Sequence, residues 1–92
     1  MATLTNTWYQ GSVGKETITE IKIVSALSGN YIESWDGSAS QDGSIMCYRN
    51  GTKVTIVCTD ITEIGDNAFS KFLELRSISG LGTVTTIGTF AF

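Results

Sequence analysis

The sequence predicts a mainly β fold with short helical turns, in which strands and a β-hairpin form an N-terminal cap that leads into a repeated segment. Composition is the first reason, since 13 Thr, 10 Ser and 10 Gly stand beside only 16% charged residues, a balance that favours strands and turns. An Asn-Gly step at 50–51 and a motif that occurs twice, at 64–69 and 87–92, are the other two reasons. The length of 92 residues suits one small domain.

Charge and hydropathy exclude two classes of function. Six Lys and Arg residues are outnumbered by nine Asp and Glu residues and are spread along the chain, so we expect no nucleic-acid binding. No run approaches the ~20 apolar residues that cross a bilayer, so we expect no membrane insertion. Residues 1–11 also lack the basic and apolar regions of a secretory signal, which leaves either a signal already removed or release by cell lysis.

The first part of the chain is expected to form an arm followed by a strand. Residues 1–16 are rich in Thr, Gly and Asn around the isolated pair Trp8 and Tyr9, and we expect an extended arm that docks through these aromatic rings. β-branched residues dominate 17–24, which predicts a strand that is buried at least partly on both faces.

A polar loop is predicted over residues 25–43. It is interrupted by Tyr31, Ile32 and Trp35, which either form a short strand or anchor the loop, and it contains two Asp-Gly steps typical of turns. For Trp35, packing against the hairpin is favoured over contact with a partner, because an aromatic ring buries so much area.

Two strand-like runs, 44–49 and 52–58, flank Asn50 and Gly51 and predict a β-hairpin over 44–58. With these two residues as the turn, Cys47 lies opposite Val54, and both cysteines fall on the apolar face. They would lie on the order of 13 Å apart along the ladder. Because bridged Cα atoms lie within roughly 7 Å, we expect Cys47 and Cys58 to be buried free thiols.

The last third of the chain repeats itself. Residues 64–69 read Ile-Gly-Asp-Asn-Ala-Phe and residues 87–92 read Ile-Gly-Thr-Phe-Ala-Phe, an offset of 23 residues from Ile64 to Ile87. This period lies within the range of leucine-rich solenoids, whose units each supply a strand, a turn and a short helical segment. We expect the Ile to point inward, the Gly to permit a tight bend, and the Ala-Phe pair to sit on a helical turn capped by Asp66.

This pattern, followed by Leu75 and Ile78, resembles the BspA-like leucine-rich repeat of bacterial surface proteins over residues 60–92. The segment from about residue 33 through the hairpin resembles, less closely, the cap region before such repeats. The resemblance implies a leucine-rich-repeat solenoid segment, with one full unit and the start of a second, and a non-catalytic recognition surface. The chain then divides into an arm at 1–16, a β cap region at 17–59 with the hairpin at 44–58, and the repeat segment at 60–92.

Side chains suited to catalysis or metal binding are sparse. The sequence contains no His, which removes the commonest general base and the Ser-His and Cys-His pairs, so we expect no enzyme activity and no cofactor. A carboxylate dyad among Glu33, Asp36 and Asp42 is the competing interpretation, although Asp before Gly is usually a turn residue. Asp36, Asp42 and Asp60 match no known calcium loop, and two cysteines supply too few ligands for zinc.

We therefore expect a non-enzymatic, surface-displayed binding or adhesion module, located extracellularly or at the cell surface, whose ligand is a protein or glycan on a host or neighbouring cell. The alternative is a structural protein of a phage virion, such as a head or tail fibre or decoration subunit, that assembles and binds host cells. A homo-oligomer would form through the uncapped last repeat. The candidate partner contacts are aromatic: Trp8, Tyr9, Tyr31, Tyr48, Phe90 and Phe92.

Overall fold

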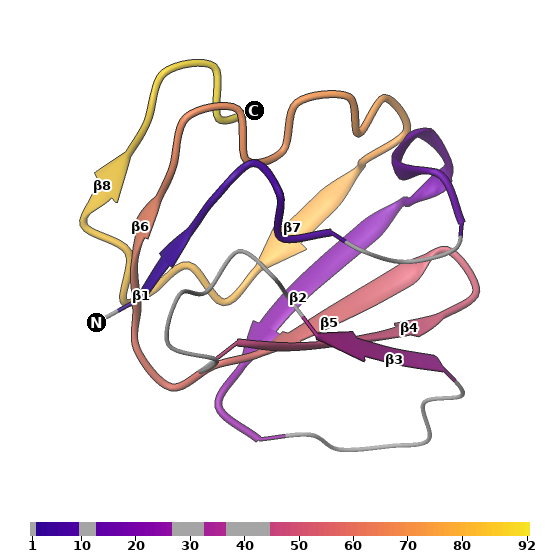
Figure 1. Ribbon diagram of the computed structural model, residues 1–92, viewed down its shortest axis with the longest axis horizontal. Helices are drawn as coiled ribbons and strands as arrows, with labels where there is room; N and C mark the ends of the chain where they lie inside the picture. The colour runs from indigo at the N-terminus through magenta and orange to yellow at the C-terminus, as the bar shows by residue number, and fades with distance from the viewer. Residues whose placement is uncertain (1, 10–12, 27–32, 37–44) are drawn as a thin grey trace.

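Strands make up almost all of the regular structure. The computed structural model describes residues 2–9, 13–26, 33–36 and 45–92. Within these ranges eight strands form two open sheets, and the only helix is the 3-10 turn η1 at Lys15–Thr17. The predicted mainly β class is confirmed (Figure 1).

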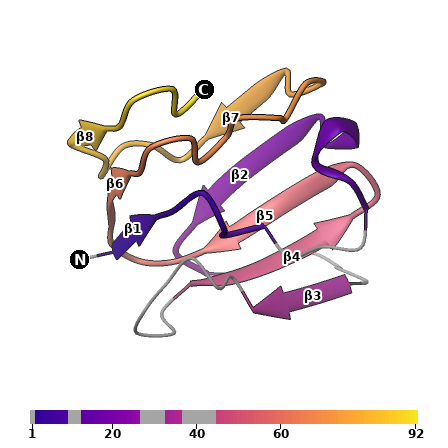
Figure 2. The same ribbon diagram turned by 45° about the horizontal axis from the view of Figure 1, so that its top comes forward.

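The larger sheet contains five strands in the order β3-β4-β5-β2-β7. The antiparallel part consists of β3, β4 and β5, while β2 runs parallel to both β5 and β7. Strand β2 therefore lies between β5 of the hairpin and β7 from the C-terminal part of the chain (Figure 2). The bounds are Glu33–Asp36 for β3, Met46–Asn50 for β4, Lys53–Val57 for β5, Glu20–Val24 for β2 and Ser77–Ser79 for β7.

The smaller sheet contains three parallel strands in the order β1-β6-β8, with bounds Ala2–Leu4, Ile61–Ile64 and Thr86–Ile87. The N-terminal residues therefore contribute a strand that pairs with the start of the repeated segment. Leu4 lies opposite Ile64, and the Gly65 N–H donates to the Leu4 carbonyl at 2.8 Å.

The β4–β5 hairpin forms where the sequence predicts it, but its register differs by two residues. Cys47 lies opposite Ile56 rather than Val54. The predicted turn is wrong because Asn50 is still the last residue of β4, and the turn consists of Gly51 and the residue after it. Gly51 has a φ of 65°, which a glycine adopts at little cost.

The face assignment of the hairpin is confirmed despite the register error. Side chains along a strand alternate with a period of two, so a shift by two residues returns every side chain to its predicted face. Both cysteines are buried and neither forms a disulfide, as predicted. The predicted apolar face is buried throughout and comprises Ile45, Cys47, Val54, Ile56 and Cys58.

Replacing Gly51 with alanine is expected to lower the free energy of unfolding by about 1 kcal/mol, because a Cβ disfavours the left-handed backbone. A Cβ at this position would meet nothing within 4 Å, so the cost is purely conformational. Urea unfolding would measure it. Gly51→Asn is the matched control and should cost less than half as much, because asparagine tolerates this region; equal costs would contradict the conformational explanation.

Strand β2 is shorter than the strand predicted over 17–24, because residues 15–17 form η1. Its Ile21 and Ile23 face the core, whereas Lys22 between them is exposed. Ile18, just before the strand, is also buried.

The predicted helical turn after Asp66 is wrong, because residues 66–71 form successive turns without α-helix. Two hydrogen bonds span three residues, from the Ala68 N–H to the Gly65 carbonyl at 3.3 Å and from the Ser70 N–H to the Asn67 carbonyl at 3.2 Å. Asn67 has a φ of 62°, a left-handed conformation that interrupts a right-handed helix.

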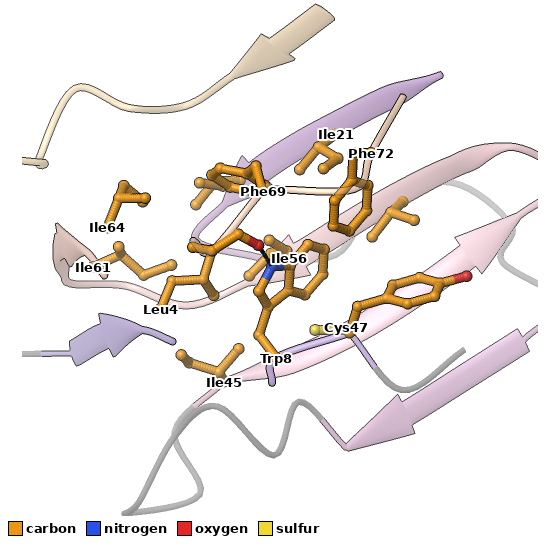
Figure 3. Packing of buried hydrophobic residues seen from close by; sticks show 14 of the residues in the cluster. Leu4, Trp8, Ile21, Ile45, Cys47, Ile56, Ile61, Ile64, Phe69 and Phe72 are labelled. Atoms are coloured by element: carbon orange, nitrogen blue, oxygen red, sulfur yellow. Dashed lines mark hydrogen bonds between the residues drawn. The ribbon is translucent and has the colours of Figure 1, made fainter. Parts of the chain in front are cut away.

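Trp8 occupies the centre of the core that the two sheets share (Figure 3). Its side chain has no exposed surface, and its Nε1–H donates to the Ala68 carbonyl at 2.8 Å. The indole ring lies 5.6 Å from the ring of Tyr9, 5.8 Å from that of Phe69 and 5.6 Å from that of Phe72. These contacts tie the N-terminal residues to the first copy of the repeat.

Candidate binding surface

The two copies of the repeated motif lie side by side with matched positions adjacent. In the β6–β8 ladder, Ile64 pairs with Ile87. The ladder continues beyond the strands, because the Asn67 N–H donates to the Thr89 carbonyl at 3.1 Å and the Phe69 N–H donates to the Ala91 carbonyl at 2.7 Å. The 23-residue offset in the sequence is therefore the register of the contact between the copies.

The two copies share their backbone conformation at one position and the burial of their alanine. Asn67 and Phe90 occupy the same motif position, and both have positive φ, at 62° and 55°. Ala68 and Ala91 are both buried. The repeated motif thus adopts the same left-handed conformation at this position in both copies, although the residue there differs.

Asp66 joins the copies through its side chain. Its Oδ1 accepts a hydrogen bond at 2.7 Å from the backbone N–H of Thr89, which holds the equivalent position in the next copy. The N-cap role predicted for Asp66 is corrected accordingly, because the carboxylate serves an N–H of the neighbouring copy and not one of its own turn.

An exposed apolar surface lies on the outer side of the second copy. Phe90 is 77% exposed, Phe92 58% and Ile87 57%. The nearby strands β7 and β8 are the edge strands of their sheets. Figure 2 shows β7, β8 and the segment up to the C-terminus along one side of the molecule, opposite β3 and β4. We call the surface of Ile87, Phe90 and Phe92, with the edges of β7 and β8, the open end.

The backbone conformation of Phe90 is unfavourable for its residue type. Asparagine tolerates positive φ, as Asn67 does in the first copy, whereas a bulky phenylalanine rarely adopts it. Strained residues of this kind cluster at sites of binding and switching. The backbone of Phe90 is therefore in an unfavourable conformation, and no described residue buries its ring to offset that cost.

Phe92 is anchored on its inner side. Its ring stacks on that of Phe69, with 5.1 Å between the ring centroids and 25° between the planes. Phe69 in turn contacts Trp8. A row of aromatic rings thus runs from the centre of the core to the open end, and only its last ring is exposed.

The other aromatic candidates lie elsewhere. Trp8 and Tyr9 are buried, so in this structure their side chains pack in the core and have almost no surface to offer a partner. Tyr48 is half-buried in β4, between residues of β3 and β5. Tyr31 lies outside the described residues. Of the aromatic candidates whose side chains are described, Phe90 and Phe92 are the exposed ones.

Ile87 belongs to this surface, although the sequence did not single it out. The motif predicts that the Ile before Gly points inward, and Ile64 in the first copy is indeed buried. Ile87 has the same place in the outer copy and is exposed because no described segment covers it. Its position in the outermost of the stacked copies was the signal that could have identified it.

The residues that the sequence offers for metal binding or acid–base chemistry are only partly described. Within the described ranges no three His, Cys, Asp or Glu side chains are placed to hold a metal ion. Of the carboxylate candidates, Asp42 lies outside the described residues, and only the backbone is described for Glu33 and Asp36 in β3. Asp60 is half-buried, and its Oδ1 lies 3.9 Å from the Cys58 Sγ.

No helix in the described residues has the length and apolar character needed to span a membrane.

Comparisons with known proteins found no match among protein-family models, curated proteins or solved structures.

Proposed function

We propose that the chain is a non-enzymatic, surface-displayed binding or adhesion module, and that the open end is its contact surface. The observation that carries this proposal is Phe90, whose ring is 77% exposed on a backbone that disfavours it. An exposed apolar cluster with polar surroundings is characteristic of interaction sites. Aromatic residues are also the side chains that contribute most to binding at protein surfaces.

The family proposal remains a BspA-like leucine-rich-repeat segment preceded by a β cap. It is supported by the 23-residue register between Ile64 and Ile87 and by the repeated turn geometry at Asn67 and Phe90. The hairpin, joined to β2 in the larger sheet, is the proposed N-terminal cap. Such modules recognise a protein or glycan on a host or neighbouring cell, outside the producing cell.

The test is binding of the fluorescently labelled full chain to intact host cells and to bacterial cells. Binding should be saturable, and Phe92→Ser should weaken it by about tenfold or more, as expected for the loss of an aromatic contact at the centre of an interface. Protease treatment of the cells against glycosidase treatment would separate a protein ligand from a glycan.

Met46→Ser is the matched control for this experiment. Met46 is an exposed apolar residue of β4, on the side of the larger sheet away from β7. Its replacement should leave cell binding unchanged. Equal losses in the two variants, or none in Phe92→Ser, would reject the open end as the contact surface.

A structural subunit of a phage virion is the second candidate function, favoured by the two edge strands at the open end. Unpaired strand edges with exposed apolar side chains promote association between copies. Light scattering would then find a defined dimer or trimer that dissociates on Phe90→Glu. A monomer unaffected by the substitution would exclude assembly through this surface.

A further inference from the structure

The N-terminal strands are stacked against the repeat in the same way as the second copy. β6 pairs in parallel with β8 on one side and with β1 on the other, which places Leu4, Ile64 and Ile87 in one row (Figure 1). In the larger sheet β2 pairs in parallel with β7. Residues 2–22 therefore supply one strand to each sheet, as residues 61–79 do. We call such a unit, a strand in each sheet with the turns between them, a layer.

The row of paired residues aligns the N-terminal segment with the repeated motif. Residues 4–9 read Leu-Thr-Asn-Thr-Trp-Tyr, and residues 64–69 read Ile-Gly-Asp-Asn-Ala-Phe. Both begin with an aliphatic residue, have Asn or Asp at the third place and end with an aromatic ring. Leu4 and Ile64 are both fully buried. The two hexapeptides share no identical residue at matched places, so the sequence alone does not show their equivalence.

One hydrogen bond between layers occurs twice at matched places. The Gly88 N–H donates to the Ile64 carbonyl at 2.7 Å, and the Gly65 N–H donates to the Leu4 carbonyl at 2.8 Å. In both cases the residue after the buried aliphatic side chain donates to the aliphatic residue of the preceding layer. The N-terminal layer thus contacts the first copy of the motif in the register in which that copy contacts the second.

The turn that follows the strand is also shared. The Trp8 N–H donates to the Thr5 carbonyl at 3.3 Å, and the Ala68 N–H donates to the Gly65 carbonyl at 3.3 Å. Each bond spans three residues and begins at the same place in the aligned segments. The backbone of the N-terminal segment therefore makes the turn of the motif without its glycine.

The absence of that glycine has a physical reason. A Cβ on Gly65 would lie 3.0 Å from the Leu4 carbonyl oxygen, and a Cβ on Gly88 would lie 2.6 Å from the backbone N of Asp66. Glycine is thus needed where the turn lies close against the backbone of a preceding layer. Within the described residues β1 is an edge strand, so Thr5 meets no such layer and can carry a side chain.

Trp8 explains the second departure from the motif. The Ala91 carbonyl accepts a hydrogen bond from the Phe69 N–H at 2.7 Å. Ala68 holds the place of Ala91 one layer earlier, and its carbonyl accepts from the Trp8 Nε1–H at 2.8 Å. A side-chain donor therefore serves this carbonyl from the N-terminal layer. The indole ring fills, in that layer, the place that alanine holds in the other two.

We propose that residues 2–22 are a diverged copy of the repeat unit. The described chain then contains two layers and the start of another, where the sequence indicates one unit and the start of a second. This count comes close to the roughly three units that such arrays need for stability. The hairpin lies against the N-terminal layer, because β5 pairs with β2. This inference rests on the family proposal and extends the repeat array to the N-terminal part of the chain.

The test transplants the motif into the N-terminal layer of the full chain. Leu4→Ile, Thr5→Gly, Asn6→Asp and Thr7→Asn together give residues 4–7 the sequence of residues 64–67. If the segments are equivalent, the transplant fits in register, and the exchange rate of the Gly65 amide, followed by NMR, should stay within about threefold of that of the unmodified chain. The Gly88 amide, which donates to the preceding layer at the matched place, is the internal reference.

The matched control places the same four residues one position earlier. Thr3→Ile, Leu4→Gly and Thr5→Asp, with Asn6 retained, give residues 3–6 the sequence Ile-Gly-Asp-Asn. A shift by one residue turns the buried side chain to the other face of the strand, so exchange at the Gly65 amide should become about tenfold faster or more. Equal exchange rates in the two variants, or faster exchange in the in-register transplant, would overturn the proposal. Faster exchange at both reference and Gly65 amides of that transplant would count in the same way.

The outcomes separate this inference from the proposed function. Loss of cell binding in Phe92→Ser, with faster Gly65 exchange in the in-register transplant, would retain the contact surface and reject the N-terminal copy. Unchanged Gly65 exchange in that transplant, with cell binding unaffected by Phe92→Ser, would support the N-terminal copy and reject the contact surface.

Discussion

Replacing Trp8 with alanine is expected to lower the free energy of unfolding by about 3–5 kcal/mol, the range for removing a large aromatic side chain from a packed core. The indole ring has no exposed surface, contacts three other aromatic rings and donates a hydrogen bond to the Ala68 carbonyl. Small domains have only about 5–15 kcal/mol to lose. Urea unfolding followed by circular dichroism would measure the change.

Two controls separate the contributions of Trp8. Trp8→Phe keeps a ring but removes the donor to the buried Ala68 carbonyl, and should cost about 1–3 kcal/mol. Met46→Ala changes an exposed residue on β4 and should stay within about 0.5 kcal/mol of the unmodified chain. A loss below 1 kcal/mol for Trp8→Ala would show that the N-terminal residues do not complete the core.

Replacing Gly80 with alanine is expected to cost about 2–4 kcal/mol, the sum of a left-handed backbone and overpacking. Gly80 has a φ of 88°, and a Cβ there would lie 2.0 Å from the carbonyl oxygen of Ile23. This obstacle is backbone, so either β2 or β7 must move. The unfolding free energy and the exchange rate of the Arg76 amide, which donates to the Thr19 carbonyl, would report the damage.

Gly82→Ala is the control for this substitution. Gly82 lies two residues further along, and a Cβ there would meet nothing within 4 Å. Its replacement should change stability by less than about 0.5 kcal/mol. If the two alanine variants were equally stable, the close approach of Gly80 to β2 would not be essential for pairing β7 with β2.

The Trp8 variants also bear on the open end. Phe92 stacks on Phe69, which contacts Trp8, so the exposed ring is positioned by the same aromatic row that fills the core. We therefore expect Trp8→Ala to impair binding through Phe92 even under conditions where the chain remains folded. We expect stability and binding to be coupled because the proposed contact surface adjoins the aromatic row of the core.

Several features could be predicted because they depend on short-range pattern. The mainly β class follows from composition, and the buried face of the hairpin follows from the alternation of Ile45, Cys47, Ile56 and Cys58. The spacing of the two Ile-Gly-x-x-Ala-Phe copies corresponds to the observed pairing of Ile64 with Ile87. The alternation along the hairpin and the repeat of the motif can both be recognised in the sequence without knowing which distant residues come into contact.

The sequence by itself therefore determined which side chains face inward along the hairpin and which residues of the repeat are equivalent. Only the tertiary structure decided the register of the hairpin, the turn in place of a helix at Asn67, the burial of Trp8, and the different exposure of Ile64 and Ile87. The physical reason is that local pattern sets a side chain's direction, whereas its burial depends on whether another layer covers it. Ile64 is covered by β8, and no described segment covers Ile87.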